Sequence, residues 1–141
     1  SLIMYKIFSK QEPEKLLHLV VRKSDIQSGR TDLIESNNFL QCSTLLLNSG
    51  KTFKPHKHIW KTSPRSLVIA QESWVVIQGS VKCFFYDIDD TLLETHNISK
   101  GECSMTFEGG HTYEILEDDT VVYEYKTGPY QGQASDKVFL P

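Results

Sequence analysis

The run QESWVVIQGSVKCFFYD, residues 71–87, has the clearest β-strand pattern in the sequence. Its first half alternates with a period of two, so Glu72, Trp74 and Val76 share one face of an expected strand. Gln78-Gly79-Ser80 are turn-forming residues, and a second run rich in valine and aromatic residues begins at Val81. Short strands separated by a tight turn indicate antiparallel β-structure.

The same pattern recurs on both sides of this run. Turn-forming residues separate the expected strands, and no helical periodicity lies between them. This spacing predicts an all-β barrel in a single domain, residues 1–141, with the barrel core at about residues 39–126. The strands are expected at Phe39–Leu47, Thr52–His58, Leu67–Ile77, Val81–Asp87, Thr91–Ile98, Glu102–Phe107, Thr112–Leu116 and Val121–Lys126.

The first 38 residues have a weaker pattern. Glu14–Val21 is compatible with a short helix or with a strand, and Ser28-Gly29-Arg30 is typical of a turn. Of these alternatives we prefer an N-terminal strand on the edge of the barrel. We also expect a homodimer, because an open barrel leaves a sheet edge to cover and two-fold association is the commonest solution.

Composition disfavours several classes of protein. The chain is 39% apolar and 23% charged, with a formal net charge of -3, which disfavours nucleic-acid and anionic-membrane partners. The longest apolar runs are too short to span a bilayer, and no signal peptide is evident. Cys42, Cys83 and Cys103 are odd in number and widely spaced, which is typical of free thiols in a reducing compartment, so we expect a cytoplasmic protein.

The histidines are the strongest candidates for a functional site. His56 and His58 are two residues apart on an expected strand, so both imidazoles can point to one enclosed face of a barrel. Neutral imidazole is a common ligand of transition metals. Glu72 lies in an apolar strand and needs a partner if its face is buried, because burying a lone carboxylate is costly. His111, which follows two glycines, can add a third imidazole.

These residues resemble the two motifs of the cupin superfamily. Gly50-x5-His56-x-His58, followed by Glu72-x6-Gly79, is similar to the first motif, GX5HXHX3,4EX6G, and Gly101 to His111 resembles the second. The resemblance implies a cupin-type jelly-roll barrel and a divalent transition metal, one of Fe, Mn, Ni, Co or Zn. The implied metal ligands are His56, His58, Glu72 and His111.

The chain departs from these motifs at two places. Thirteen residues separate His58 from Glu72, where the family has three or four, so Ile59–Val68 is expected to form an inserted loop near the barrel mouth. The second motif lacks its proline and its final asparagine.

Two stretches resemble narrower groups of cupins. Residues 122–130 with Asp136-Lys137 are similar to the ending of cupin metalloproteins from O-antigen and capsule gene clusters. Residues 71–82 resemble cupin ketoisomerases and epimerases that act on nucleotide-linked keto sugars. Both resemblances imply a sugar or sugar-nucleotide ligand.

Several positions have a simpler interpretation. His18 and His96 match no pattern and are expected on the surface or in a satisfied core. His56 and His58 could be a solvated pair within a basic stretch, and that stretch could instead bind a phosphate. The basic residues are Lys51, Lys54, Lys57, Lys61 and Arg65.

Three functions are consistent with the sequence. A metal held by three histidines and a glutamate keeps coordination positions open for substrate oxygens and acts as a Lewis acid. In a metal-free sugar-nucleotide isomerase or epimerase, a histidine would be the general base and a tyrosine the acid. A non-catalytic sugar-binding module is the third. The candidate bases are His56 and His58, and the candidate acids are Tyr113, Tyr123 and Tyr125.

Overall fold

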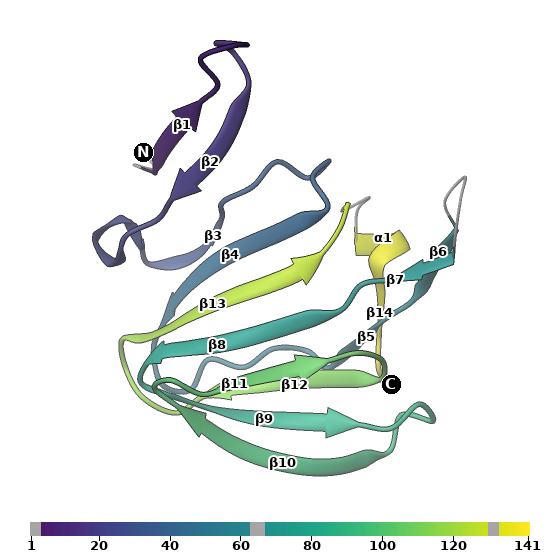
Figure 1. Ribbon diagram of the computed structural model, residues 1–141. Coiled ribbons are helices and arrows are strands. Elements are labelled where there is room, and N and C mark those ends of the chain that lie inside the picture. Colours follow the sequence, from purple (N-terminus) through teal and green to yellow (C-terminus); the bar gives the residue numbers. More distant parts are fainter. Residues whose placement is uncertain (1–3, 63–66, 130–132) are drawn as a thin grey trace.

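The computed structural model describes residues 4–62, 67–129 and 133–141. Two five-stranded antiparallel sheets form a barrel (Figure 1). In the first sheet the strand order is β11 (Cys103–Thr106), β8 (Glu72–Gln78), β13 (Thr120–Thr127), β4 (Leu40–Leu47) and β3 (Gly29–Asp32). In the second sheet it is β10 (Leu92–Ser99), β9 (Ser80–Tyr86), β12 (Gly110–Ile115), β5 (His56–His58) and β14 (Lys137–Phe139). The expected all-β jelly-roll barrel is confirmed.

The core lies between the inner faces of the two sheets. Burying each large apolar side chain there contributes about 1.5–3 kcal/mol. Trp74 and Tyr113 stack across the gap with ring centroids 3.8 Å apart, which joins the sheets near their middle. The core residues are Leu45, Trp74, Val76 and Val122 from the first sheet and Val81, Cys83, Tyr113 and Ile115 from the second.

The chain crosses from one sheet to the other at Gly79, between β8 and β9. Gly79 has a φ of +81°, and a Cβ placed there would lie 2.2 Å from the hydroxyl oxygen of Thr120. Only glycine fits this corner, because it tolerates a left-handed conformation and has no side chain to clash. The turn expected from the sequence therefore changes sheets and does not close a hairpin.

Two smaller hairpins lie outside the main sheets. The N-terminal hairpin pairs β1 (Tyr5–Phe8) with β2 (Leu16–Val20) and stands away from the barrel in Figure 1. The second pairs β6 (Trp60–Thr62) with β7 (Leu67–Ile69) and corresponds to the expected insertion at 59–68. Within the part of the chain that the structure describes, no helix is both long and apolar enough to cross a bilayer.

Several expected elements differ from the observed ones. Ser28-Gly29-Arg30 is not a turn, because Gly29 and Arg30 begin β3, which pairs with β4 at the edge of the first sheet. Residues 14–21 contain strand β2 and no helix, but β2 pairs only with β1. The expected strand 67–77 is interrupted at Ala70-Gln71 and becomes β7 and β8. The short 3-10 helix η1 (Lys23–Asp25), helix α1 (Gln133–Asp136) and β14 were not expected.

Candidate metal centre

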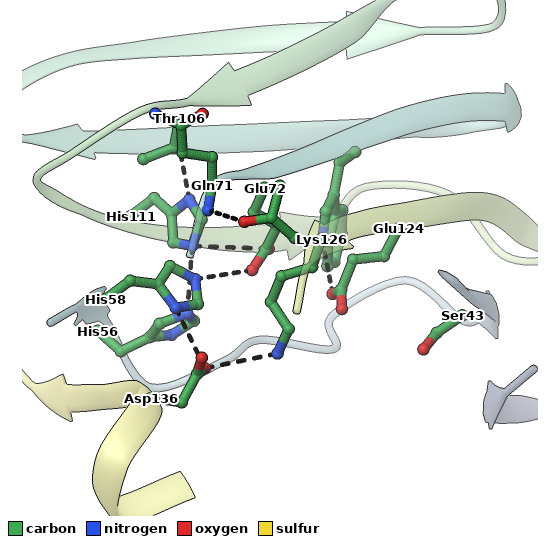
Figure 2. Close-up of polar contacts among 12 residues, drawn as sticks. Ser43, His56, His58, Gln71, Glu72, Thr106, His111, Glu124, Lys126 and Asp136 are labelled. Atoms are coloured by element: carbon green, nitrogen blue, oxygen red, sulfur yellow. Dashed lines mark hydrogen bonds and ion pairs between the residues drawn. The ribbon is translucent and has the colours of Figure 1, made fainter. Parts of the chain in front are cut away.

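Three strands bring the predicted residues to one point. β5 carries His56 and His58, β8 carries Glu72, and β12 carries His111, which is paired with His56 across the two strands. Ligand atoms from all four residues lie within 4.8 Å of one another, and Figure 2 shows the side chains converging. His58, Glu72 and His111 are buried, whereas His56 is partly exposed.

Glycines allow β12 to approach β5 this closely. A Cβ on Gly110 would lie 2.8 Å from the Leu140 side chain and 3.3 Å from the carbonyl oxygen of His56. A larger residue at this position would push the two strands apart. Gly110, which directly precedes His111, therefore permits the short distance between the imidazoles of His111 and His56.

Each imidazole turns its Nε2 atom towards the centre and its Nδ1 atom towards a partner. The Nδ1 atom of His58 lies 3.2 Å from a carboxylate oxygen of Asp136, and that of His111 lies 2.9 Å from the hydroxyl of Thr106. His56 Nδ1 lies 3.4 Å from the carbonyl oxygen of Lys54. A ring whose Nδ1–H donates outward presents the Nε2 lone pair inward, which is the arrangement of metal-binding histidines in proteins.

The inward atoms contact one another at short range. The Nε2 atoms of His56 and His111 are 3.1 Å apart, and Nε2 of His58 is 3.0 Å from a Glu72 oxygen. The second Glu72 oxygen is 3.6 Å from Nε2 of His111. Three imidazole nitrogens and one carboxylate fit Fe, Mn, Co, Ni and Zn, and this donor set does not distinguish among these metals.

Charge in the cluster is concentrated on His58 and Glu72. Burial alone would lower the pKa of His58, but its hydrogen bonds to Asp136 and Glu72 raise it to about 9. Burial would raise the pKa of Glu72, yet the hydrogen bond from His58 and the neighbouring imidazoles lower it to about 2. The pKa of His56 is lowered to about 3, mainly by burial and secondly by the charge of the nearby His111. Burial also lowers the pKa of His111. At neutral pH the metal-free cluster therefore holds one ionisable proton, on His58.

Asp136 is a site residue that the sequence reasoning did not assign. It is fully buried at the end of α1, immediately before β14, which pairs with β5 and places Lys137 opposite His58. Its carboxylate also lies 3.5 Å from the ammonium of Lys126. The apolar run at residues 138–140 could have indicated a C-terminal strand, but nothing in the sequence shows that this strand joins β5.

A cavity of about 410 Å³ opens onto the cluster beside His56 and Glu72. Phe53, Trp74 and Tyr113 form its apolar part. This volume is within the range of small-molecule sites.

Glu124 anchors one wall of the cavity. It accepts hydrogen bonds from the indole of Trp74 at 2.9 Å and from two nitrogens of Arg30 at 2.7 and 3.1 Å. Arg30 also donates to Ser43 and Asp32. The bidentate ion pair between Arg30 and Glu124, whose other polar atoms are also hydrogen-bonded, holds this wall in a fixed geometry.

The candidate tyrosines fall on different faces. Tyr113 lines the cavity, and its hydroxyl lies 3.2 Å from Ser104 and 3.4 Å from Nδ1 of His111. Burial raises its pKa well above 10. Tyr123 and Tyr125 alternate with the inward-facing Glu124 on β13 and stack on each other on the outer face. The prediction that Tyr123 could act in the site is therefore wrong, because strand alternation turns it away.

The remaining basic and histidine residues lie outside the cluster. His18 and His96 are exposed, as expected. Lys51, Lys54 and Lys57 do not line the cavity, and Lys57 forms an ion pair with Asp90 at 2.8 Å. Arg65, the predicted phosphate clamp, and the side chain of Lys61 lie outside the described part of the chain.

Comparison with solved structures gives similar folds at low sequence identity. KdgF from Halomonas sp. matches with a TM-score of 0.55 and 18% identity over 74% of this chain and 81% of KdgF. A protein with a double-stranded β-helix domain from Klebsiella pneumoniae matches with a TM-score of 0.57 and 14% identity, over 86% of this chain and 90% of that chain.

CapF from Staphylococcus aureus, a capsular polysaccharide assembling protein, gives a TM-score of 0.58 and 17% identity over 85% of this chain. The match covers 36% of CapF, so this chain spans about a third of that protein. No family model and no curated protein matches the sequence. Together the structural matches show that the chain has the double-stranded β-helix, or cupin, fold.

Proposed function

We propose that this chain is a cupin-type metalloprotein that binds and converts a sugar or sugar nucleotide at His56, His58, Glu72 and His111. The observation that carries the proposal is the donor geometry. Three Nε2 atoms and one carboxylate lie within 4.8 Å of one another, and each Nδ1 atom is held by a separate partner. A hydrogen-bonded core cluster without a metal function would not need all three imidazoles aimed at one point.

The chemistry follows from the open side of the cluster. A bound divalent metal supplies Lewis acidity to oxygen ligands. His56 and Glu72 border the cavity, so a substrate oxygen entering from there reaches the centre without moving the buried His58 or His111. Trp74, Tyr113 and Phe53 offer apolar and aromatic surface on which a sugar ring can pack while water is excluded. The similarity in fold to CapF, a capsular polysaccharide assembling protein, supports a sugar-related ligand.

The experiment that tests this proposal compares metal content and turnover. Wild-type protein purified without added metal is expected to retain close to one transition metal per chain, whereas His58→Ala and Glu72→Gln lose it. His96→Ala is the matched control, because it removes an exposed imidazole outside the cluster. Metal lost together with conversion of the sugar or sugar nucleotide that the wild-type chain turns over supports the proposal, and full activity in chelator-treated protein contradicts it.

A metal-free isomerase or epimerase is the second candidate, and one observation favours it. His56 and Tyr113 both line the cavity, and His56 is neutral at pH 7, as a general base must be, although burial lowers its pKa to about 3 and makes it a weak base. His58 does not fit this role, since carboxylates engage both of its ring nitrogens and it is already protonated. Turnover that survives chelation but is lost in Tyr113→Phe would favour this candidate. Sugar binding without turnover would favour the non-catalytic module.

We further propose a homodimer built around the N-terminal hairpin. Tyr5, Phe8 and Leu17 on this hairpin are 64%, 47% and 51% exposed. The outer face of the first sheet carries a second apolar surface, where Met105 and Leu40 are 61% and 56% exposed. Reciprocal packing of hairpin on sheet across a two-fold axis would remove both apolar surfaces from water. The buried free thiols of Cys42 and Cys83 support a reducing, cytoplasmic location.

A further inference from the structure

Two lysines from opposite sheets meet at the wall of the cavity beside the candidate metal centre. Lys126 comes from β13 and Lys137 from β14, and both line the cavity together with His56 and Glu72. Burial is the largest cause of the lowered pKa of Lys137, and the positive charge of Lys126 is the second. The two ammonium groups therefore lie within electrostatic range of each other. Like charges held together in this way favour an anion between them.

The carboxylates near the cavity already have partners. Glu124 binds Arg30 and Trp74, Asp32 binds Arg30 and Ser43, and Asp136 binds His58 and Lys126. Among the ion pairs between described residues, none includes Lys137, whose ammonium lies 5.9 Å from the ring centroid of Phe139. Lys137 is therefore the cation in this cavity with the most capacity left for a ligand.

The balance of charge also favours an anion. With a divalent metal bound, the cavity and its border would hold five positive charges and four carboxylates. A ligand with one negative charge would balance this excess, whereas a diphosphate would exceed it. The positive charges are those of the metal, Arg30, Lys126 and Lys137, and the carboxylates are Asp32, Glu72, Glu124 and Asp136.

We propose that the substrate of this site is a sugar acid or related hydroxy acid whose carboxylate is bound by Lys137 and Lys126. This inference rests on the proposed metal function, because the hydroxyl or carbonyl oxygens of the same molecule would face His56 and Glu72. A cavity of about 410 Å³ lies at the small end of ligand pockets and suits a molecule of monosaccharide size. Lys137 selects for the acid over the neutral sugar through a charge-assisted hydrogen bond.

The test measures ligand binding to the full chain loaded with Co²⁺. The probes are galacturonate, gluconate, galactose and UDP-galactose, and binding is followed by calorimetry and by the visible absorption of the cobalt ion. At least one of the two acids is expected to bind about tenfold or more tightly than galactose, and Lys137→Gln is expected to remove that preference. The preference should also weaken as salt is raised, because the lysine is partly exposed.

Lys54→Gln is the matched control. Its ammonium lies 4.9 Å from the centroid of the same Phe139 ring, but it does not line the cavity. Unchanged cobalt content in both variants, with acid binding lost only in Lys137→Gln, supports the inference. Any of three results overturns the inference. The acids and the neutral sugar bind equally, UDP-galactose binds more tightly than either acid, or Lys137→Gln keeps the wild-type affinity for the acid.

Failure of the metal function gives a different result. If the wild-type chain takes up no cobalt, calorimetry on the metal-free chain still compares acid with neutral sugar in wild type and Lys137→Gln. A preference for the acid that depends on Lys137 then supports the lysine subsite while the metal function fails. No such preference overturns both.

Discussion

Replacing Asp136 by asparagine tests how the fold prepares the cluster for a metal. Asp136 is fully buried and lies 3.2 Å from Nδ1 of His58, whose Nε2 faces the centre. Asparagine keeps the shape and can still accept the Nδ1–H hydrogen bond, but it removes the negative charge. The imidazole then becomes a weaker base and a less strictly oriented ligand.

The magnitude follows from the loss of charge in a buried contact. A charge-assisted hydrogen bond contributes about 1.5–3 kcal/mol and a neutral one about 0.5–1.5 kcal/mol. The difference, on the order of 1–1.5 kcal/mol, corresponds to roughly tenfold in metal affinity. Since Asp136 is shielded from solvent, we expect a 10- to 100-fold loss of the intrinsic metal affinity, that is, the affinity corrected for the proton that His58 releases on binding.

Competition with a chromophoric chelator measures this affinity, and Asp90→Asn is the matched control. Asp90 pairs at 2.8 Å with Lys57, which lies between His56 and His58 on the same strand, but Asp90 does not contact the cluster. Its φ of +72° is one that asparagine tolerates, so the control should fold normally. Wild-type affinity in Asp136→Asn, or an equal loss in both variants, would refute this account of His58.

Four further predictions concern proton release, the pH dependence of stability, the ligand set and assembly. Because His58 has a raised pKa of about 9 in the metal-free chain, metal binding at pH 7 should release about one proton. The apparent metal affinity should therefore fall about tenfold per pH unit below 9. Calorimetry in buffers of different ionisation enthalpy counts the protons released, and a count near zero or near three would contradict this prediction. The same raised pKa stabilises the metal-free chain, fully below about pH 6.5, which is the pKa of His58 in the unfolded chain, and this stabilisation is lost as pH rises through 9. The free energy of unfolding should therefore be lower at pH 10 than at pH 6. His58→Ala should show no such drop. Tyr113→Phe should keep metal content at the wild-type level, since its hydroxyl is not among the ligand atoms, and loss of metal in this variant would contradict the ligand set. Light scattering should give a dimer mass for wild type and a monomer mass for Leu17→Glu, while a monomeric wild type at tens of micromolar would remove the dimer proposal.

The barrel and the ligand cluster followed from local pattern. Alternation along β8 correctly placed Glu72, Trp74 and Val76 on one buried face. The two-residue spacing of His56 and His58 likewise predicted that both would face inward, and the structure confirms this. These inferences depend only on the period of a strand, which the sequence contains directly.

Features that depend on tertiary pairing could not be read from the sequence. Asp136 reaches His58 only because β14 adds to the edge of β5, a contact between residues 78 positions apart. The outward face of Tyr123 is an exception, because its alternation with the inward-facing Glu124 on β13 is a local pattern that the sequence contains. Gly29-Arg30 has the composition of a turn, yet pairing with Leu45 and Leu46 of β4 draws it into a strand. For Asp136 and for Gly29-Arg30, a distant partner decided the conformation.

An anomalous difference map at the cobalt edge, from crystals of the chain loaded with Co²⁺, tests the metal centre most directly. If the metal centre is as proposed, one strong peak is expected at about 2.0–2.2 Å from the Nε2 atoms of His56, His58 and His111, bound also by Glu72. A map with no peak at this position, while the four side chains remain hydrogen-bonded to one another, would contradict it.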